Sequence, residues 1–387
     1  MTIDVTNLRK FVSPEIIFGV GARHAAGNFA RNFGANKVLV VSDPGVIKAG
    51  WVSDVEASLQ ELDINYVIYS DVSANPRAEE VMAGAELYDA ENCDLIIAVG
   101  GGSPMDCAKG IGIVHANRSH ILTYEGIDRI AIPIPPLIFI PTTAGTSADV
   151  SQFCIISDQQ ERTKISIISK AVVPDVSLID PETTSSIDPF LTACTGIDAM
   201  VHAIEAFVST GAGPLTDMYA LEAIKLISQN LQGLVHDPQD IYLREKIMLG
   251  SMKAGLAFSN AILGAVHAMS HSLGGYLDLP HGLCNSILLD HVIDFNYKSA
   301  PERFRSIAEQ LEIDTRGMSD THVKSALLTK VRDLKQQVGL SMQLGEAGVK
   351  LTDIPILASK AIIDPCILTN PRASNKRDME TVYEEAL

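Results

Sequence analysis

The sequence predicts two domains, an α/β domain in the first half of the chain and an all-helical domain in the second half. Up to about residue 186, short apolar runs alternate with helical patterns, whereas beyond it apolar residues recur every three or four positions. The length of 387 residues also exceeds what one hydrophobic core commonly holds. We therefore expect the domains to span residues 1–186 and 187–387.

Strands are predicted in the first half wherever a short apolar run ends in turn residues. Three such runs are residues 37–43 (KVLVVSD), 64–71 (INYVIYSD) and 94–102 (DLIIAVGGG). Helical patterns at residues 53–62 and 77–91 separate them. Nearly continuous apolar strands with helices between them are typical of a parallel sheet that is covered on both faces.

The second half shows helical periodicity with few strand signals. Clear examples are residues 191–210, 215–231, 301–311 and 321–339. Apolar residues at three- and four-residue spacing predict helices that bury one face. A ligand cleft is expected between two such domains.

Composition excludes some classes of partner. The net charge of −17 would repel phosphate backbones and anionic membranes, so we expect neither a nucleic-acid nor a membrane partner. The apolar run at residues 130–141 is too short and too rich in proline for a membrane helix and is predicted to be a buried strand. No secretory signal is visible, and the six cysteines form no C-x-x-C pair, which favours a cytoplasmic protein with reduced thiols.

A glycine-rich run at residues 99–109 (VGGGSPMDCAK) directly follows a predicted strand. Glycines let the backbone turn tightly and approach a ligand, and Ser103 can cap a helix that has Pro104 in its first turn. The free N–H groups at such a helix end attract phosphate. Spacing alone leaves two interpretations open, a pyrophosphate site and an ordinary strand-to-helix turn.

The usual G-x-G-x-x-G dinucleotide fingerprint is absent. Residues 19–24 (GVGARH) begin like one but break at the last position, so we expect only a turn there. Asp43 ends a predicted strand, where a carboxylate can accept a hydrogen bond from a ribose hydroxyl and repel the extra phosphate of NADP. It precedes the glycine run instead of following it, so it could equally be a turn residue.

Histidines and one aspartate recur at helical spacing in the second half. Asp198 and His202 are four residues apart in an apolar helical pattern, and His267 and His271 repeat that spacing. His281 follows a proline and is expected on a turn. Several ionisable groups in apolar surroundings are costly to bury unless they share a partner, and a divalent cation would suit them all. The alternative is that each is a core histidine satisfied by one hydrogen bond.

Taken together, the motifs resemble those of the iron-dependent (group III) alcohol dehydrogenases. The matching segments are residues 100–109, 141–153 (PTTAGTSADVSQF), 195–209 (TGIDAMVHAIEAFVS), the pair His267 and His271, and residues 280–285 (PHGLCN). The similarity covers essentially the whole chain. It implies a dehydroquinate synthase-like fold, with a Rossmann-like dinucleotide-binding α/β domain, a helical metal-binding and substrate domain, and the active site between them.

The resemblance also implies roles for individual residues. It assigns the metal ligands to Asp198, His202, His267 and His281, with Fe²⁺ expected and Zn²⁺ or Mn²⁺ as alternatives. It places His271 near the nicotinamide in proton transfer. It assigns NAD binding to Asp43, which favours NAD over NADP, and to Gly100, Gly101, Gly102, Ser103, Asp106, Thr142, Thr143, Thr146 and Lys164.

The implied activity is hydride transfer between NAD(H) and a small primary alcohol or aldehyde whose oxygen is held by the cation. Alternatives are a polyol dehydrogenase similar to glycerol dehydrogenases, and a weakly active relative with a regulatory or sensor role. The family commonly reads TTAGTGSE where this chain reads TTAGTSAD at residues 142–149, which puts cofactor affinity in question. The resemblance also implies a homodimer or larger homo-oligomer.

Overall fold

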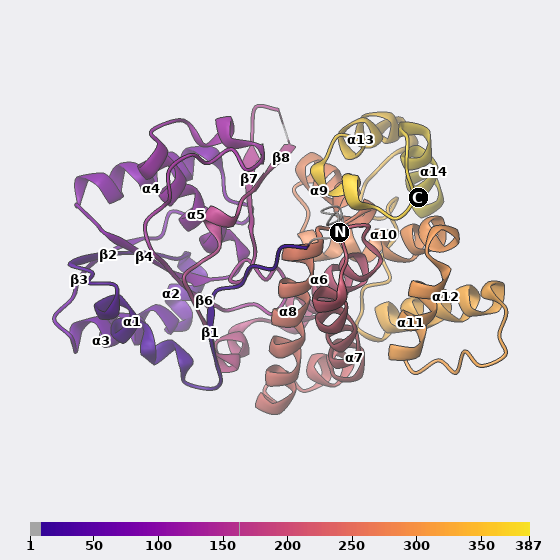
Figure 1. The fold of residues 1–387 in the computed structure, drawn as a ribbon, viewed down its shortest axis with the longest axis horizontal. Helices are drawn as coiled ribbons and strands as arrows, with labels where there is room; N and C mark the ends of the chain where they lie inside the picture. The colour runs from indigo at the N-terminus through magenta and orange to yellow at the C-terminus, as the bar shows by residue number, and fades with distance from the viewer. Residues whose placement is uncertain (1–8, 162) are drawn as a thin grey trace, which may run out of the picture.

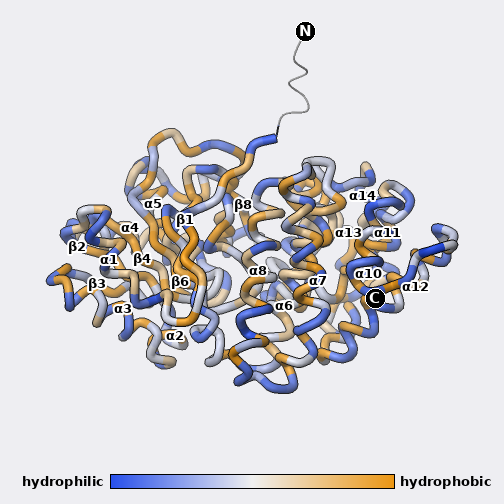
Figure 2. Tube along the Cα trace, turned by 60° about the horizontal axis from the view of Figure 1, so that its bottom comes forward, coloured by the Kyte–Doolittle hydropathy of each residue, from blue (hydrophilic) through white to orange (hydrophobic). Residues whose placement is uncertain are grey.

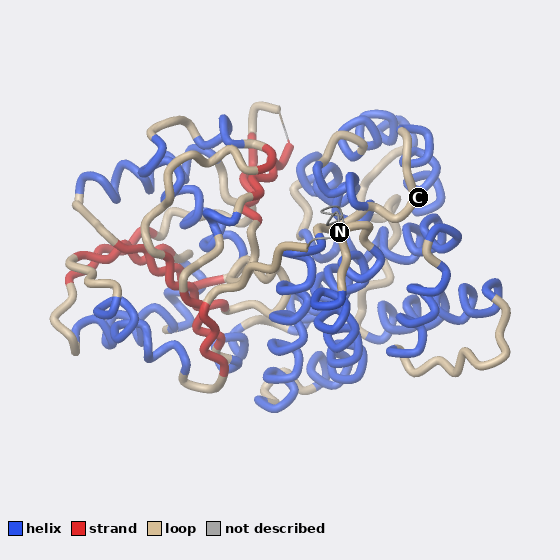
Figure 3. Tube along the Cα trace, viewed as in Figure 1, coloured by secondary structure: helices blue, strands red, loops and turns tan. Residues whose placement is uncertain are grey.

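Two domains lie side by side in the computed structural model, which describes residues 9–161 and 163–387 (Figure 1). The strands lie in the first half of the chain and the second half is helical (Figure 3). This architecture confirms the predicted fold class. The last strand ends at Ile179 and the first long helix of the second half begins at Pro189. The domain boundary at residue 186 stays a prediction.

A six-stranded parallel sheet forms the centre of the α/β domain. In sheet order, its strands are β1 (Glu15–Phe18), β9 (Val176–Ile179), β6 (Leu137–Pro141), β4 (Leu95–Gly100), β2 (Lys37–Val41) and β3 (Asn65–Tyr69). The helices around it are α1 (Ala26–Asn32), α2 (Pro44–Ala49), α3 (Trp51–Gln60), α4 (Ala78–Ala90) and α5 (Gly102–Asn117).

Successive side chains of each strand point to opposite faces of this sheet. Both sets are apolar, so helices cover both faces. Val38 and Val40 of β2 pack with α1 and α3, whereas Leu39 and Val41 pack with α4 and α5 on the other face. All four side chains are fully buried. Figure 2 shows the strands β1 and β6 as largely hydrophobic.

A second, three-stranded sheet was not expected from the sequence. Its order is β5 (Gly126–Ile127), β8 (Thr163–Ile168) and β7 (Phe153–Asp158). The pair β7 and β8 is antiparallel, because the two strands are joined by a short turn instead of a crossover helix. This sheet brings Lys164 of β8 to the edge of the helical domain, beside α9.

The helical domain is built around one buried helix. Its helices are α6 (Pro189–Val208), α7 (Pro214–His236), α8 (Ile241–Ala261), α9 (Ala265–Leu277), α10 (His281–Asn296), α11 (Pro301–Gln310), α12 (Asp320–Gln337), α13 (Ile354–Ala361) and α14 (Lys376–Ala386). By length and composition α6 could cross a membrane, but its residues 192–208 are buried against α7, α8 and α10. Its apolar character therefore reflects its place in the core.

The cleft between the domains opens at the carboxyl ends of the parallel strands. Gly100 of β4 pairs with Pro141 of β6, so the loops that follow these two strands start side by side. A cavity of about 800 Å³ lies there and is lined by residues from both domains. Ligands of open α/β sheets bind at this edge, which makes the cavity the candidate active site.

Candidate active site and metal centre

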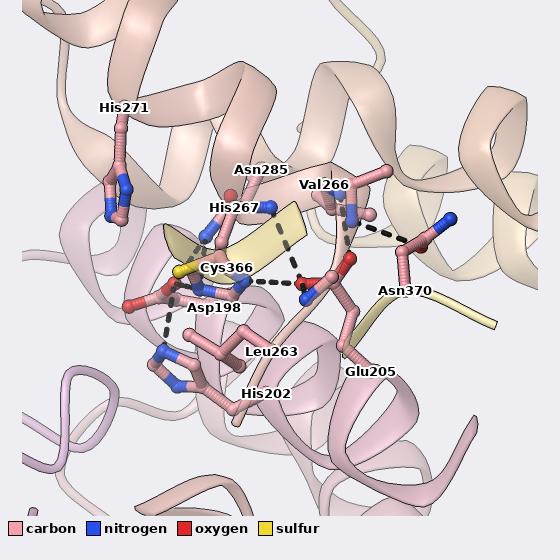
Figure 4. Close-up of polar contacts among 12 residues, drawn as sticks. Asp198, His202, Glu205, Leu263, Val266, His267, His271, Asn285, Cys366 and Asn370 are labelled. Carbon is pink, nitrogen blue, oxygen red and sulfur yellow. Dashed lines mark hydrogen bonds and ion pairs between the residues drawn. The ribbon is translucent and has the colours of Figure 1, made fainter. Parts of the chain in front are cut away.

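One carboxylate oxygen lies at the centre of the histidine cluster. The Oδ1 atom of Asp198 is 3.9 Å from the Nε2 atom of His202 and 3.8 Å from the Nε2 atoms of His267 and His281. Four ligands placed tetrahedrally at about 2.1 Å from one ion would lie about 3.4 Å apart. The donor atoms of Asp198, His267 and His281 all lie within 4.8 Å of one another, a spacing that suits one divalent cation, and His202 lies beside Asp198 at the edge of this group. Figure 4 shows three of these side chains and their contacts.

Three helices deliver these donors. Asp198 and His202 are one turn apart on α6, His267 lies in the first turn of α9, and His281 is the first residue of α10, where a turn was expected. The start of α10 can approach α6 closely because residue 282 is glycine. A Cβ atom there would lie 2.2 Å from the carbonyl oxygen of Cys194.

The amide of Asn285 is the innermost neighbour of the cluster. Its Nδ2 atom donates to Asp198 Oδ1 at 2.6 Å and lies 3.2 Å and 3.3 Å from the Nε2 atoms of His267 and His281. The buried Oδ1 atom of Asn285 has no hydrogen-bond partner among the described residues. The two N–H groups of the Asn285 amide therefore face three atoms, one on each of Asp198, His267 and His281. The polar atoms of the cluster are thus not fully satisfied by one another.

Burial and mutual charge set the protonation of the cluster. Burial lowers the pKa of His202 to about 3 and holds that of His281 well below its usual value. Burial alone would raise the pKa of Asp198, but the surrounding imidazoles hold it well below its usual range. Burial lowers the pKa of His267, but its hydrogen bonds with Asp198 and Glu205 outweigh burial and raise that pKa to about 9. An ionised carboxylate and neutral imidazoles are the forms that ligate a borderline divalent cation, so a cation bound here displaces a proton from His267. The residues present therefore fit a divalent metal ion.

His271 lies next to this cluster on α9. Its ring centroid is 5.3 Å from that of His281 and 6.0 Å from that of His267, and it lines the cavity. Its Nδ1 atom is 2.9 Å from the Oδ2 atom of Asp364. Burial raises the pKa of that carboxyl, but the contact with His271 outweighs burial, and the pKa is lowered. Among the described residues, Asp364 is thus the side chain that orients the His271 ring at the cavity, and a role of His271 in proton transfer stays a prediction.

The expected cofactor residues gather on the α/β side of the same cavity. Those that line it are Asp43, Gly101, Gly102, Ser103, Asp106, Thr142, Thr143, Thr146 and Lys164. Gly100 lies in β4 directly before them and is not among the lining residues. Cβ atoms at Gly101 and Gly102 would lie 3.1 Å and 3.0 Å from the side chains of Thr143 and Thr146. Glycine therefore lets the two loops touch at the base of the cavity.

The predicted capping role of Ser103 is wrong. Helix α5 begins two residues earlier than predicted, with Gly101 at its N-cap, and the Ser103 hydroxyl instead accepts from the backbone N–H of Asn75 at 3.2 Å. The N-cap of α5 therefore makes no side-chain hydrogen bond, and Gly102 and Ser103 of its first turn line the cavity. Free N–H groups at the start of a long helix favour a phosphate.

Asp43 is a turn residue that caps a helix, which is one of the two interpretations that the sequence left open, and ribose binding stays a prediction. Its Oδ1 atom accepts from the backbone N–H groups of Gly45 and Val46, at 2.8 Å and 2.9 Å, and so caps α2. It also lines the cavity at the end of β2. A turn residue in this place still has a carboxylate oxygen to offer a ligand.

Comparison with known proteins identifies this arrangement. Residues 13–181 match the family model described as iron-containing alcohol dehydrogenase, and residues 192–387 match the one described as Fe-containing alcohol dehydrogenase family, C-terminal. The chain belongs to the iron-containing alcohol dehydrogenase family. It is an NAD-dependent oxidoreductase of small alcohols and aldehydes, as the sequence predicted. The alternatives of a polyol dehydrogenase and a sensor are not favoured.

Similar proteins cover nearly the full length of this alcohol dehydrogenase. It is 38% identical over 371 residues to 1,3-propanediol dehydrogenase from Citrobacter freundii, covering 95% of this chain and 96% of that protein. It is 35% identical over 377 residues to NAD-dependent methanol dehydrogenase from Bacillus methanolicus, covering 97% and 99%. A crystal structure of 1,3-propanediol oxidoreductase superposes with a TM-score of 0.95 at 36% identity, covering 98% of this chain and all of that one.

The TTAGTSAD segment of this alcohol dehydrogenase departs from the common family pattern at a left-handed residue. Ser147, where the family commonly has glycine, has φ of 51°, a conformation that costs most side chains free energy. Its hydroxyl donates to the backbone carbonyl of Ser251 on α8 at 2.8 Å. The serine therefore ties the loop of residues 142–149 in the first domain to α8 in the second domain.

Three polar residues of the site had no role assigned from the sequence. Asn285, Glu205 and Asp364 contact Asp198, His267 and His271, respectively. Glu205 and Asn285 fall inside the matching motifs, but only folding shows which histidine each reaches. An acid in the strongly apolar pattern of residues 195–209 was the one available signal for Glu205.

Proposed function

We propose that this alcohol dehydrogenase holds Fe²⁺ on Asp198, His202, His267 and His281 and interconverts short primary alcohols and aldehydes with NAD(H). The observation that carries this proposal is the placement of three imidazole nitrogens within 3.9 Å of one carboxylate oxygen. Nitrogen and oxygen ligands of this kind also accept Zn²⁺ and Mn²⁺, so the family relationship is what favours iron.

When bound, the cation supplies Lewis-acid activation of the alcohol, and NAD⁺ accepts the hydride. The protein's own residues provide position, proton transfer and exclusion of water. His271 takes up the proton that the alcohol releases, at the Nε2 atom that its contact with Asp364 leaves free. Phe258 stacks on His202 at 4.2 Å between ring centroids and shields the cluster from solvent.

The substrate side of the cavity has an apolar wall. Phe153, Ile155, Phe258 and Leu263 line it, and Phe258 stacks on the ring of His202. An apolar wall favours a small uncharged substrate over a phosphorylated or multiply charged one. The 1,3-propanediol and methanol dehydrogenases among the relatives agree with short alcohols. We therefore propose primary alcohols of about one to four carbons as substrates.

NAD is proposed to lie along the α/β side of the cavity. The N-terminus of α5 would hold the pyrophosphate, Thr142, Thr143 and Thr146 would contact the phosphates and adenosine, and Asp43 would accept from the ribose. Lys164, whose Nζ atom donates to Asn75 at 2.7 Å, would lie near the nicotinamide ribose. Asp106 lines the same cavity.

A homo-oligomer is also proposed, formed through the edge strand β1. This strand has one neighbour, β9, in the six-stranded sheet, and the exposed Val20 follows it. An unpaired edge is a template for pairing with a second copy. Light scattering after gel filtration measures the molar mass of the assembly and so tests whether the chain forms an oligomer. Cytoplasmic localisation stays a prediction.

The central test combines metal analysis with turnover. Protein purified without oxygen should contain one equivalent of iron per chain, and chelation should abolish oxidation of 1-propanol by NAD⁺. The variant Asp198→Asn should lose both iron and turnover, by at least 100-fold in kcat. His291→Gln, which alters a histidine of the same helix as His281 outside the cavity, should retain both. Full turnover in the chelated protein would refute the proposal.

A further inference from the structure

Glu205 is a buried carboxylate on α6, one turn beyond His202, with only 3% of its surface exposed. Burying a carboxylate is costly unless its oxygens accept several hydrogen bonds. Both oxygens of Glu205 are engaged, and among the described residues the one ion-pair partner of Glu205 is His267. Its position in the core therefore depends on what it binds in α9.

The first contribution of Glu205 is to cap the buried start of α9. The chain bends by 101° between α8 and α9, so the first-turn N–H groups of α9 lie inside the domain. Glu205 accepts from the N–H groups of Gly264, Val266 and His267 at 3.1 Å, 2.6 Å and 3.3 Å. A negative charge at this end also suits the helix dipole.

The second contribution concerns the ring of His267. The Oε2 atom of Glu205 lies 2.7 Å from the Nδ1 atom of His267 (Figure 4). An ionised carboxylate can only accept, so the Nδ1 atom carries the proton of this bond. In the neutral form that a metal ligand requires, the lone pair of the ring is then on Nε2, the nitrogen that lies 3.8 Å from Asp198 Oδ1.

We propose that Glu205 is the positioning residue that fixes the tautomer and ring orientation of His267 for cation binding. This inference rests on the proposed metal site. Helix α6 then supplies two ligands, Asp198 and His202, and also the partner that aims a third. A hydrogen bond to the second nitrogen of a ligating imidazole commonly strengthens metal binding by 10- to 100-fold.

Asn370 provides a matched control for the capping role. Its Oδ1 atom accepts from the N–H of Ala265 at 3.1 Å, in the same first turn of α9, and no hydrogen bond joins it to His267 among the described residues. Removing either side chain leaves a buried N–H group without its acceptor and destabilises the domain. Only Glu205 also touches the His267 ring.

The experiment measures Fe²⁺ affinity by anaerobic titration against a competing chelator, together with thermal unfolding of the metal-free proteins. Glu205→Gln replaces one carboxylate oxygen by an NH₂ group. If this group faces the N–H groups of α9, donor faces donor. If it faces the His267 ring, it donates to Nδ1 and moves the ring proton to Nε2. We expect its Kd for Fe²⁺ to rise 10- to 100-fold. Asn370→Ala should unfold at lower temperature yet keep the wild-type Kd. Ring-nitrogen NMR of the metal-free protein should show Nδ1–H in the wild type and a changed state in Glu205→Gln.

The outcomes separate this inference from the proposed function. Fe²⁺ binding that is tight in wild type and equal in Glu205→Gln overturns the positioning role and leaves the metal site intact. An equal loss of affinity in Asn370→Ala also overturns it, because capping would then explain the effect. If Glu205→Gln does not fold, Glu205→Asp replaces it in the experiment. Its shorter side chain cannot reach both the N–H groups of α9 and the His267 ring, and its Kd for Fe²⁺ is compared with that of Asn370→Ala in the same way. Wild-type protein that binds no Fe²⁺ overturns both.

Discussion

The Nδ1 atom of His271 and the Oδ2 atom of Asp364 lie 2.9 Å apart although 93 residues separate them in the chain. The other oxygen of Asp364 accepts from the backbone N–H of Cys366 at 2.8 Å and caps the short helix η8 (Pro365–Thr369). The carboxylate is therefore held in place on one side and orients the imidazole on the other.

Replacing Asp364 by asparagine should lower kcat for alcohol oxidation by about 10- to 100-fold, because an amide can hold either tautomer of His271 and carries no charge. Steady-state kinetics with NAD⁺ and 1-propanol measure this. The control is Asp353→Asn, a carboxylate before α13 that has no contact with His271 among the described residues. A normal kcat in Asp364→Asn would show that His271 needs no such partner.

Gly282→Ala should displace the start of α10 and, with it, His281. An added Cβ would lie 2.2 Å from a backbone oxygen of α6, which cannot move without unwinding the helix. We expect the iron content to fall well below one equivalent in protein that still shows helical circular dichroism. Gly112→Ala in α5, whose Cβ would lie 3.4 Å or more from the side chains of Ile134 and Pro135, should keep its iron. Full iron content in both variants would contradict the close approach.

The left-handed conformation of Ser147 makes a prediction about stability. Ser147→Ala and Ser147→Gly both lose the hydrogen bond to Ser251, but only glycine accepts φ of 51° without strain. The glycine variant should therefore be more stable than the alanine variant by about 1 kcal/mol in the free energy of unfolding. Denaturant unfolding of the two proteins at one pH measures the difference. Equal stability, or a more stable alanine variant, would refute strain at this position.

Asp149 should make the protein less stable as the pH rises from about 4 to about 6. Burial raises the pKa of this carboxyl to about 6, although a hydrogen bond from Ser177 opposes the shift. The folded protein thus holds its proton more tightly than the unfolded chain, whose Asp pKa is about 3.9, and stability falls across that window. Asp149→Asn lacks this titration.

Thermal midpoints of wild type and Asp149→Asn at several pH values test this. The wild-type midpoint should fall relative to that of the variant between pH 4 and pH 6, and the difference should stay constant above pH 7. A difference that is independent of pH from 4 to 8 would show that the carboxyl titrates normally.

The spacing of apolar and ionisable residues in the sequence predicted those features of the fold that lie within a single helix or strand. The apolar run of β2 and the four-residue spacing of Asp198 and His202 follow from the strand and helix periods alone, and both agree with the structure. The convergence of α6, α9 and α10 has no local signal. It depends on close approaches such as that of Gly282 to α6, which tertiary packing decides.

The partners of the histidines could not be read from spacing for the same reason. Asp364 reaches His271 from a different part of the chain, and Ser103 does not cap α5 because the helix starts before it, so its hydroxyl accepts from the N–H of Asn75 instead. The antiparallel pair of β7 and β8 was missed because it breaks the strand–helix alternation that the rest of the domain follows. Such features depend on which segments meet in space.

The most direct measurement is an anomalous difference map, recorded at the iron absorption edge, from a crystal grown without oxygen in the presence of Fe²⁺. We predict one strong peak per chain, about 2.0–2.3 Å from a carboxylate oxygen of Asp198 and from one nitrogen each of His202, His267 and His281. A peak bound by other residues, or a map without a peak between the domains in protein that oxidises alcohols, would contradict the account.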